Sequence, residues 1–508
     1  MAFEPVYDTA VFDTYRRLGT GQAVVEARLL PRPETRIAKV LSTSSQISIG
    51  AAEAFTGEAR YSGRVNFKVL FETTEGGVEM LDYNADFSDK IEAKGVGAAT
   101  KTCFSATILD MDIIAAEEDV VKLAAVVEVT LYGCDRENIK YLARGGESVY
   151  TREDRVKCCN LVAEANDTFI VSDTVTDLNG CEIIATEAEA FVSRIDSFDD
   201  SVAITGETVA TLVLRSQSGA LSSKRIYIPI DWQCRADGAR AGDITTGGIC
   251  VKNVSVSMSG GGEETVAELE LTLKADVLVF RTDEITPSID AFCLENELLS
   301  TVQSVEISMP KGDVTITDTV EGNVAIDEKL PLADAISGVF GSRVSISNVL
   351  SGDGRVTVEG MLGCNIVYVN TERGSNTVFA QVPFSLALNA DGVEEGDFVT
   401  AVAGVKDVNV KIRRGNELSL RGDICIRLTP VKSCVSAIIS EIKVGEAKQP
   451  REAAISVHIA RKGETVWDAA KALGLTPEEV TRQNPDVAMP CAGGERLVAY
   501  RQMEKKAK

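Results

Sequence analysis

The chain has 508 residues, of which 44% are hydrophobic and 25% are charged. This composition is typical of globular domains and differs from that of disordered or collagen-like chains. At roughly 100 to 200 residues per domain, the length of the chain predicts three to five domains. Acidic residues outnumber basic residues 76 to 52, which gives a formal net charge of -24. A charge of that sign repels phosphate backbones and anionic lipids, so it argues against nonspecific nucleic-acid binding and against an electrostatic membrane anchor.

The start of the chain and its cysteines predict a cytoplasmic protein. Residues 1–5 contain no basic region followed by an apolar core, so we expect no secretory signal, and no uncharged apolar run approaches the roughly 18 residues that cross a bilayer. The 12 cysteines have irregular spacings. We expect them to stay reduced and to pack as small apolar residues, as the strand patterns around Cys364 and Cys425 indicate, and the adjacent Cys158 and Cys159 form no CxxC pair.

Residues 1–20 have the pattern of an amphipathic segment. Phe3, Tyr7, Val11 and Tyr15 recur at every fourth residue, a spacing that predicts a short helix with one apolar face. Such a face usually packs against the protein's own core, and this is the interpretation we favour. The alternative is a helix that docks on a partner.

Three segments of the chain repeat one layout, in which a strand-like stretch reaching a glycine is followed by an alternating apolar strand, a polar turn and another strand. The glycines are Gly63, Gly206 and Gly360; an apolar residue stands 24 residues beyond each (Phe87, Ile230, Phe384), and another stands 45 residues beyond each, at Ile108, Val251 and Val405. Two offsets that agree in three copies predict a domain-sized repeat of roughly 140 to 155 residues.

The repeats predict a mainly β protein made of three tandem β-sandwich-like modules, at residues 21–150, 151–300 and 301–440. Apolar residues alternate within each copy, as in Val65, Phe67 and Val69, so one face of each strand packs on a core and the other meets water. Glycine-rich turns separate the strands, among them residues 259–262. The pattern leaves the strand order open.

A different pattern follows a polar linker at residues 441–454. Residues 455–459 predict a strand, and two helices follow it, each with an N-terminal capping box: Thr465 with Asp468, and Thr476 with Glu479. The second helix ends near residues 484–485, because a proline disfavours helix in the residue before it. A final strand at 497–500 gives the order βααβ for a small domain at residues 455–503.

This C-terminal segment resembles the LysM family. The resemblance rests on Val457, residues 463–467 (GETVW), residues 469–471 (AAK), residues 484–485 (NP) and Leu497. It implies a βααβ fold that binds N-acetylglucosamine-containing glycans, or a partner, between two loops. The corresponding residues here are Gly463, Glu464, Thr465, Val466, Asn484, Pro485, Asp486 and Val487. Trp467 is expected to be mainly a core residue of the small domain, with a sugar platform as the alternative.

Three β-rich repeats before one terminal LysM-like domain are similar to the SipL-type spore coat morphogenetic proteins. The resemblance implies a scaffold in sporulation, made in the mother cell cytoplasm and localised at the forespore surface. It also implies protein–protein interaction with the coat morphogenetic ATPase (SpoIVA) and other coat proteins, partly through the LysM domain. The alternative is a LysM protein whose function is peptidoglycan binding.

The residue types argue against an enzyme. The chain has one histidine, His458, so histidine-dependent triads and multi-histidine metal sites are nearly excluded. No GxxxxGK[ST] phosphate loop is present, and a hairpin turn explains residues 260–262. A glycosidase that uses two carboxylates stays open on composition alone. We expect no catalytic residue, no cofactor and no metal.

Overall fold

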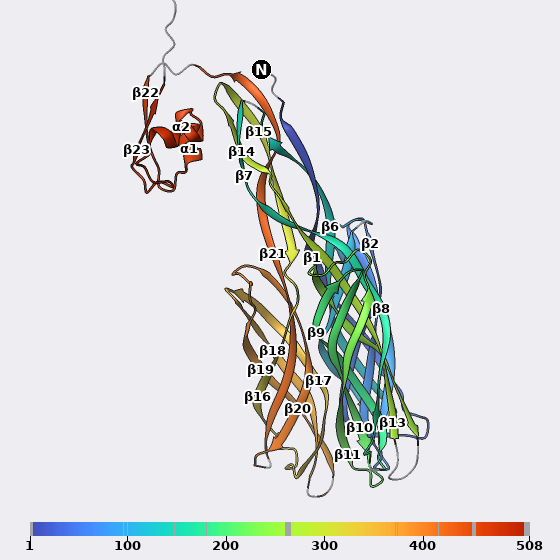
Figure 1. Cartoon of the computed structure of the whole chain (residues 1–508). Helices are drawn as coiled ribbons and strands as arrows, with labels where there is room; N and C mark the ends of the chain where they lie inside the picture. Colours follow the sequence, from blue (N-terminus) through green and yellow to red (C-terminus); the bar gives the residue numbers. More distant parts are fainter. Residues whose placement is uncertain are drawn as a thin grey trace, which may run out of the picture.

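The computed structural model describes residues 4–501 except 95, 99, 147, 179, 260–265, 371, 373, 415 and 450–453. The glycine-rich turn expected at 259–262 therefore lies almost entirely outside the described residues. Most of the described chain forms antiparallel β-sheets, which confirms the mainly β fold class. Figure 1 shows an orange group of strands beside a group in which blue and green strands overlap, long strands that continue beyond both, and a small domain that contains both helices.

The first module consists of two facing three-stranded antiparallel sheets. Its strands are β1 (Val6–Leu29), β2 (Ile37–Phe55), β3 (Glu58–Thr73), β4 (Val78–Glu92), β5 (Lys101–Glu117) and β6 (Val120–Arg144). One sheet has the order β2-β3-β4. The other has the order β1-β6-β5 and continues into module 2, because β1 also pairs with β8 (Val156–Val175) at Asp13 and Cys159. Alternate apolar residues of both sheets meet in one core, in which Val65, Phe67 and Val127 are fully buried. The module is therefore a β-sandwich.

The second and third modules repeat this arrangement. Module 2 contains β8 (Val156–Val175), β9 (Glu182–Phe198), β10 (Ser201–Arg215), β11 (Leu221–Arg235), β12 (Ile244–Ser259) and β13 (Val266–Ile285). Module 3 contains β15 (Asn296–Pro310), β16 (Val314–Ala325), β17 (Ala335–Gly352), β18 (Arg355–Val369), β19 (Ser375–Asn389), β20 (Phe398–Ile412) and β21 (Glu417–Ala447). Each has a three-stranded sheet, β9-β10-β11 or β17-β18-β19, facing a second sheet that contains β8-β13-β12 or β16-β21-β20.

The repeat glycines occupy one structural position in the three modules. Each lies in the middle strand of the three-stranded sheet and pairs with the apolar residue 24 positions later: Gly63 with Phe87, Gly206 with Ile230, and Gly360 with Phe384. The neighbouring strand has a register shift beside each glycine. A Cβ on Gly206 would lie 2.1 Å from the Phe191 carbonyl oxygen. Only glycine lets the bulged strand approach this closely.

The second repeat position marks another β-bulge. The last two strands of each module shift register directly after the residue 45 positions beyond the glycine. The next residue is therefore unpaired, and in the three modules it is Leu109, Lys252 and Lys406. A bulge re-aims side chains, and here it directs two lysines at the neighbouring module. Lys252 Nζ donates to the Ile49 carbonyl oxygen (3.0 Å), and Lys406 forms an ion pair with Glu207. The repeated bulges thus help to join the modules.

The prediction of a helix within residues 1–20 is wrong. Residues 6–20 belong to β1, which pairs with β6 along almost its full length and places Phe12 in a fully buried position. A spacing of four residues is also a multiple of the two-residue period of a strand, so Tyr7, Val11 and Tyr15 lie on one face of β1 as they would on a helix. Residue 3, the first of the stripe, lies outside the described part.

The predicted linker at 441–454 is also wrong at its start. Residues 441–447 belong to β21, which pairs with β15 up to Asn296 and Ala447. Residues 450–453 lie outside the described part. A second two-stranded ribbon beside this region is formed by β7 (Val149–Glu153) and β14 (Ser288–Cys293), which connect the modules.

The C-terminal domain has the predicted βααβ order: β22 (Ile455–Ile459), α1 (Val466–Leu473), α2 (Pro477–Gln483) and β23 (Arg496–Tyr500). Both predicted capping boxes are present, and Gly474 ends α1 in the left-handed conformation at φ 66°. The strands pair antiparallel from Ile455–Tyr500 to Ile459–Arg496. In the described part of the chain, no helix has the length and apolar character needed to span a membrane.

Replacing Gly206 with alanine tests the role of the repeat glycines. The added Cβ would collide with the Phe191 carbonyl, so we expect Gly206→Ala to lower the free energy of unfolding by about 1–3 kcal/mol in urea titrations. Gly97→Ala is the matched control, because nothing lies within 4 Å of its added Cβ; its effect should stay within about 0.5 kcal/mol. Equal losses for both variants would contradict the steric explanation.

Candidate functional site

Trp467 docks the C-terminal domain on the β7–β14 ribbon. Its indole packs edge-on against Phe292 with the ring centroids 4.9 Å apart, and Phe292 in turn stacks on Tyr150 at 5.3 Å. The indole Nε1 donates to Asp290 Oδ2 at 2.7 Å. Trp467 thus packs partly on the small domain's core, as expected, but its tip contacts another part of the chain. Sequence patterns carry no signal for that contact.

Asp290 receives two donors from the C-terminal domain. Lys471 Nζ lies 2.9 Å from both of its carboxylate oxygens, and Trp467 supplies the third hydrogen bond. Partial burial acts to raise the pKa of Asp290, but the hydrogen bonds from Lys471 and Trp467 outweigh it, so the pKa lies below its ordinary value. The contact is therefore fully charged at neutral pH and weakens only when the pH falls through that lowered pKa.

The first predicted binding loop is held by its own hydrogen bonds. Glu464 Oε1 lies 2.5 Å from His458 Nε2, while Glu464 Oε2 accepts from the Arg461 amide at 2.8 Å. Gly463 adopts φ 83° and donates to the Cys491 carbonyl oxygen at 2.8 Å. Thr465 caps α1, and the Val466 side chain packs on the domain core. Of these four residues, Gly463 is the exposed one.

The second predicted loop has a buried end and an exposed end. Asn484 is buried; its side chain donates to the Val480 and Val498 carbonyl oxygens and accepts from the Val498 amide, which ties α2 to β23. Val487 packs on the core, whereas Pro485 and Asp486 are exposed. The structure therefore assigns a structural contact to Asn484 and Val487 and leaves Pro485 and Asp486 open to a ligand.

An exposed apolar face of the C-terminal domain was not predicted as a site. Ile455, Val457 and Ile459 of β22 are 58%, 58% and 65% exposed, and Tyr500, paired with Ile455, is 58% exposed. Their alternation predicted the strand, but it did not reveal that the apolar side of this strand faces water. We call these four residues the β22 face. Contiguous exposed apolar side chains of this size are typical of interaction surfaces.

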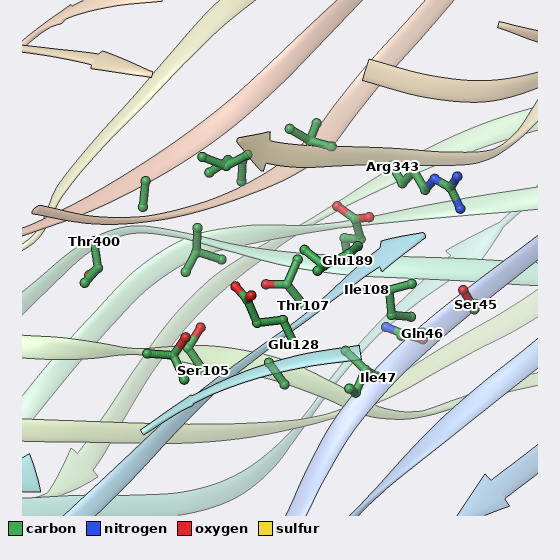
Figure 2. Close-up of a pocket in the computed structure, with 18 of the residues that line it drawn as sticks. Ser45, Gln46, Ile47, Ser105, Thr107, Ile108, Glu128, Glu189, Arg343 and Thr400 are labelled. Atoms are coloured by element: carbon green, nitrogen blue, oxygen red, sulfur yellow. The ribbon is translucent and has the colours of Figure 1, made fainter. Parts of the chain in front are cut away.

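A second candidate site is a cavity of about 540 Å³ between the three modules. Figure 2 shows Gln46, Glu189 and Arg343 around it, one from each module. Each of these residues stands at the same distance in sequence before its module's repeat glycine. Counting backwards from Gly63, Gly206 and Gly360 could have found them, although it could not have shown that the three positions converge.

Glu189 is the most perturbed carboxyl of this cavity. Burial away from bulk water raises its pKa to about 7, a change that the hydrogen bond from the Val405 amide (3.0 Å) only partly offsets. Within the described residues Glu189 forms no ion pair, and its Oε1 atom has no hydrogen-bond partner. The side chain is half-buried and borders the cavity. It is an acid that is available to a ligand.

Docking through Trp467 can be tested by fluorescence, because the chain has two tryptophans. In a Trp232→Phe background we expect Asp290→Ala to shift Trp467 emission to longer wavelength, since the indole becomes exposed to water. Loss of charged hydrogen bonds worth about 1.5–3 kcal/mol should weaken docking roughly ten- to hundredfold. Asp486→Ala, an exposed carboxylate of the same domain, is the control. An unchanged spectrum in the Asp290 variant would show that the contact is absent in solution.

The raised pKa of Glu189 predicts a pH dependence of stability. The folded protein keeps a proton on Glu189 up to about pH 7, while the unfolded chain loses it near the ordinary value of 4.5, so stability falls as the pH rises through that window. Glu189→Gln removes this loss. The difference between the free energy of unfolding of the Glu189→Gln variant and that of the parent should therefore grow in favour of the variant from pH 5 to pH 8, by at most about 3 kcal/mol.

The control for this titration is Glu58→Gln. Hydrogen bonds from Lys90 and Arg60 lower the pKa of the half-buried Glu58, so its contribution to stability is lost only as the pH falls through that lowered value. The free energy of unfolding of the Glu58 variant should therefore change with pH in the same way as that of the parent between pH 5 and 8. If the free energy of unfolding of the Glu189→Gln variant also changed with pH as that of the parent does, the raised pKa of Glu189 would be refuted.

Two stretches of the chain match a known protein family. The family SipL, SPOCS domain, matches residues 36–115 and 341–413, while no curated protein and no solved structure matches the chain. The matched stretches span β2–β5 of module 1 and β17–β20 of module 3, and the LysM resemblance stays a prediction. Two segments of the chain are thus similar to the SipL, SPOCS-domain family, which suggests a sporulation-related protein.

Proposed function

We propose that this protein is a non-enzymatic scaffold of spore coat assembly that binds a coat morphogenetic ATPase. The observation that carries the proposal is the SPOCS-domain match in modules 1 and 3. The sequence resemblance places such proteins in the mother cell cytoplasm, at the forespore surface, and we propose the same location here. Three rigidly joined modules with a small domain docked at one end suit a protein that brings partners together.

We propose that the β22 face contributes to this contact. Ile455, Val457 and Ile459 project from one side of β22, away from the domain core and from the Trp467 contact. Covering side chains of this type yields roughly 1.5–3 kcal/mol each. Exposed Arg461, Lys462 and Arg496 border the Ile459 end, so a partner surface with an apolar centre and acidic edge would fit.

Several features support a role without catalysis. The single histidine, His458, is engaged with Glu464. Burial raises the pKa of Cys364 to about 12 and that of Cys159 to about 12, which leaves these thiols protonated and poorly nucleophilic. Among the described residues no cluster of three or more His, Cys, Asp or Glu side chains has the geometry of a metal site. These features favour a binding protein.

The test is binding of the purified full-length protein to the purified coat ATPase. Ile455→Ser together with Val457→Ser should weaken binding about tenfold or more, because two apolar side chains would no longer be buried on association. Arg482→Gln, an exposed side chain of α2 outside the β22 face and the predicted LysM loops, is the control and should bind as the parent does. Circular dichroism checks that each variant is folded.

The same preparation, exposed to purified peptidoglycan, distinguishes the alternative. Retention on peptidoglycan that is lost in Asp486→Ser, with no binding to the ATPase, would make the protein a LysM glycan binder and would end the scaffold proposal. Binding to the ATPase that survives the double substitution at Ile455 and Val457 would keep the scaffold proposal but remove the β22 face from it.

A further inference from the structure

The walls of the central cavity are formed by the edge strands of the modules. β2, β5, β9 and β17 are each the last strand of their sheet, and β20 pairs with β21 alone. All five line the cavity. An edge strand carries a row of backbone N–H and C=O groups without a strand partner. Such groups therefore lie around this cavity.

The edge of β20 runs along the whole site. Phe398 to Ala403 line the main cavity, and Val402 to Gly404 line a second cavity of about 250 Å³ that shares Gln46, Ile47 and Glu189 with the first. A strand seen from one face presents alternate residues. Here seven successive residues of β20, from both faces of the strand, line the cavities, which indicates that the edge of the strand faces them. At roughly 3.3 Å per residue this edge is about 23 Å long.

Other edges of the modules are blocked by side chains from neighbouring modules. Gln46 Nε2 donates to the Ala188 carbonyl oxygen at 2.9 Å, and Lys68 donates to the Thr186 carbonyl oxygen. At the end of the open run, the Val405 amide donates to Glu189. Within the described residues, the backbone of Phe398–Gly404 receives no such side-chain hydrogen bond. This segment of β20 is the stretch left open.

The charges around the open edge favour a basic ligand. Glu189 Oε1 lacks a hydrogen-bond partner in the described part, and Glu187, which accepts from the Gly341 amide at 3.3 Å, forms no ion pair there either. The three cations of the cavity wall already have partners. Arg343 is paired with Asp110 at 3.2 Å, Lys68 donates to the Thr186 carbonyl oxygen, and Arg17 donates to the Thr20 hydroxyl at 2.7 Å. A cation brought next to Glu189 would lower its raised pKa and give the buried carboxylate a partner.

From this geometry we infer that the cavity binds an extended polypeptide segment of a partner protein, which pairs with the free edge of β20 from Phe398 to Gly404 and places a lysine or arginine side chain at Glu189. Backbone hydrogen bonds along the edge supply affinity without reading the sequence, and the buried acid supplies the preference for a base. The site is separate from the β22 face, so it provides the scaffold with a second means of binding.

The test uses the full-length protein and three fluorescent nine-residue peptides of alternating threonine and valine, with lysine, glutamine or glutamate at the centre. We expect the lysine peptide to bind at least tenfold more tightly than the glutamate peptide. We also expect its binding to slow amide hydrogen exchange in residues 398–404. Glu189→Gln should bind the lysine and glutamine peptides equally, and Val402→Trp, which fills the shared part of the two cavities, should bind none.

Three results would overturn the proposal. They are no binding of any peptide to the folded parent, binding that leaves hydrogen exchange at 398–404 unchanged, and competition by N-acetyl-lysine amide at the same concentration as the lysine peptide. The last result would make the cavity a site for small cations. Glu128→Gln, which changes another carboxylate of the cavity wall, is the control variant and should keep the preference for lysine.

Discussion

Open strand edges are the constraint on which this structure depends. Each module packs one three-stranded sheet on a second sheet, which modules 1 and 2 share and which has four strands in module 3. Each module therefore has edge strands that would invite uncontrolled pairing if they faced water. The chain turns β2, β5, β9, β17 and β20 towards one common centre and covers most of them with side chains of the next module. The cavity between the modules is what remains when this covering is incomplete, which is why it is lined by edges rather than by apolar faces.

The repeated irregularities of the sheets serve the same end. A bulge beside Gly63, Gly206 and Gly360 bends the strand next to the central one, and a second bulge re-aims Lys252 and Lys406 across the module boundary. Bulges increase the local twist of a sheet. The contacts made from the equivalent bulges differ: Lys252 donates to a backbone carbonyl and Lys406 pairs with Glu207, whereas Leu109 of module 1 lines the cavity.

Sequence patterns predicted what depends on local chemistry and missed what depends on distant contacts. The capping boxes at Thr465 and Thr476 follow from short-range rules. The 24-residue offset from each repeat glycine indicated a repeat, but it did not predict that the two residues pair across neighbouring strands. The helix expected near the N-terminus failed because a four-residue spacing fits a strand as well as a helix. Neither the contact of Trp467 with Asp290 nor the burial of Glu189 has a signal in the sequence, since both join parts of the chain that are far apart.

The two binding surfaces differ in how they can be regulated. The β22 face lies on a small domain whose position depends on a charged contact, that of Asp290 with Trp467 and Lys471. Such contacts weaken with salt, and the loss of this one is expected to weaken docking roughly ten- to hundredfold. The β20 edge lies between the three modules and already borders the cavity. A partner can therefore move the first surface, whereas the second is preformed and must be entered by a thin, extended chain.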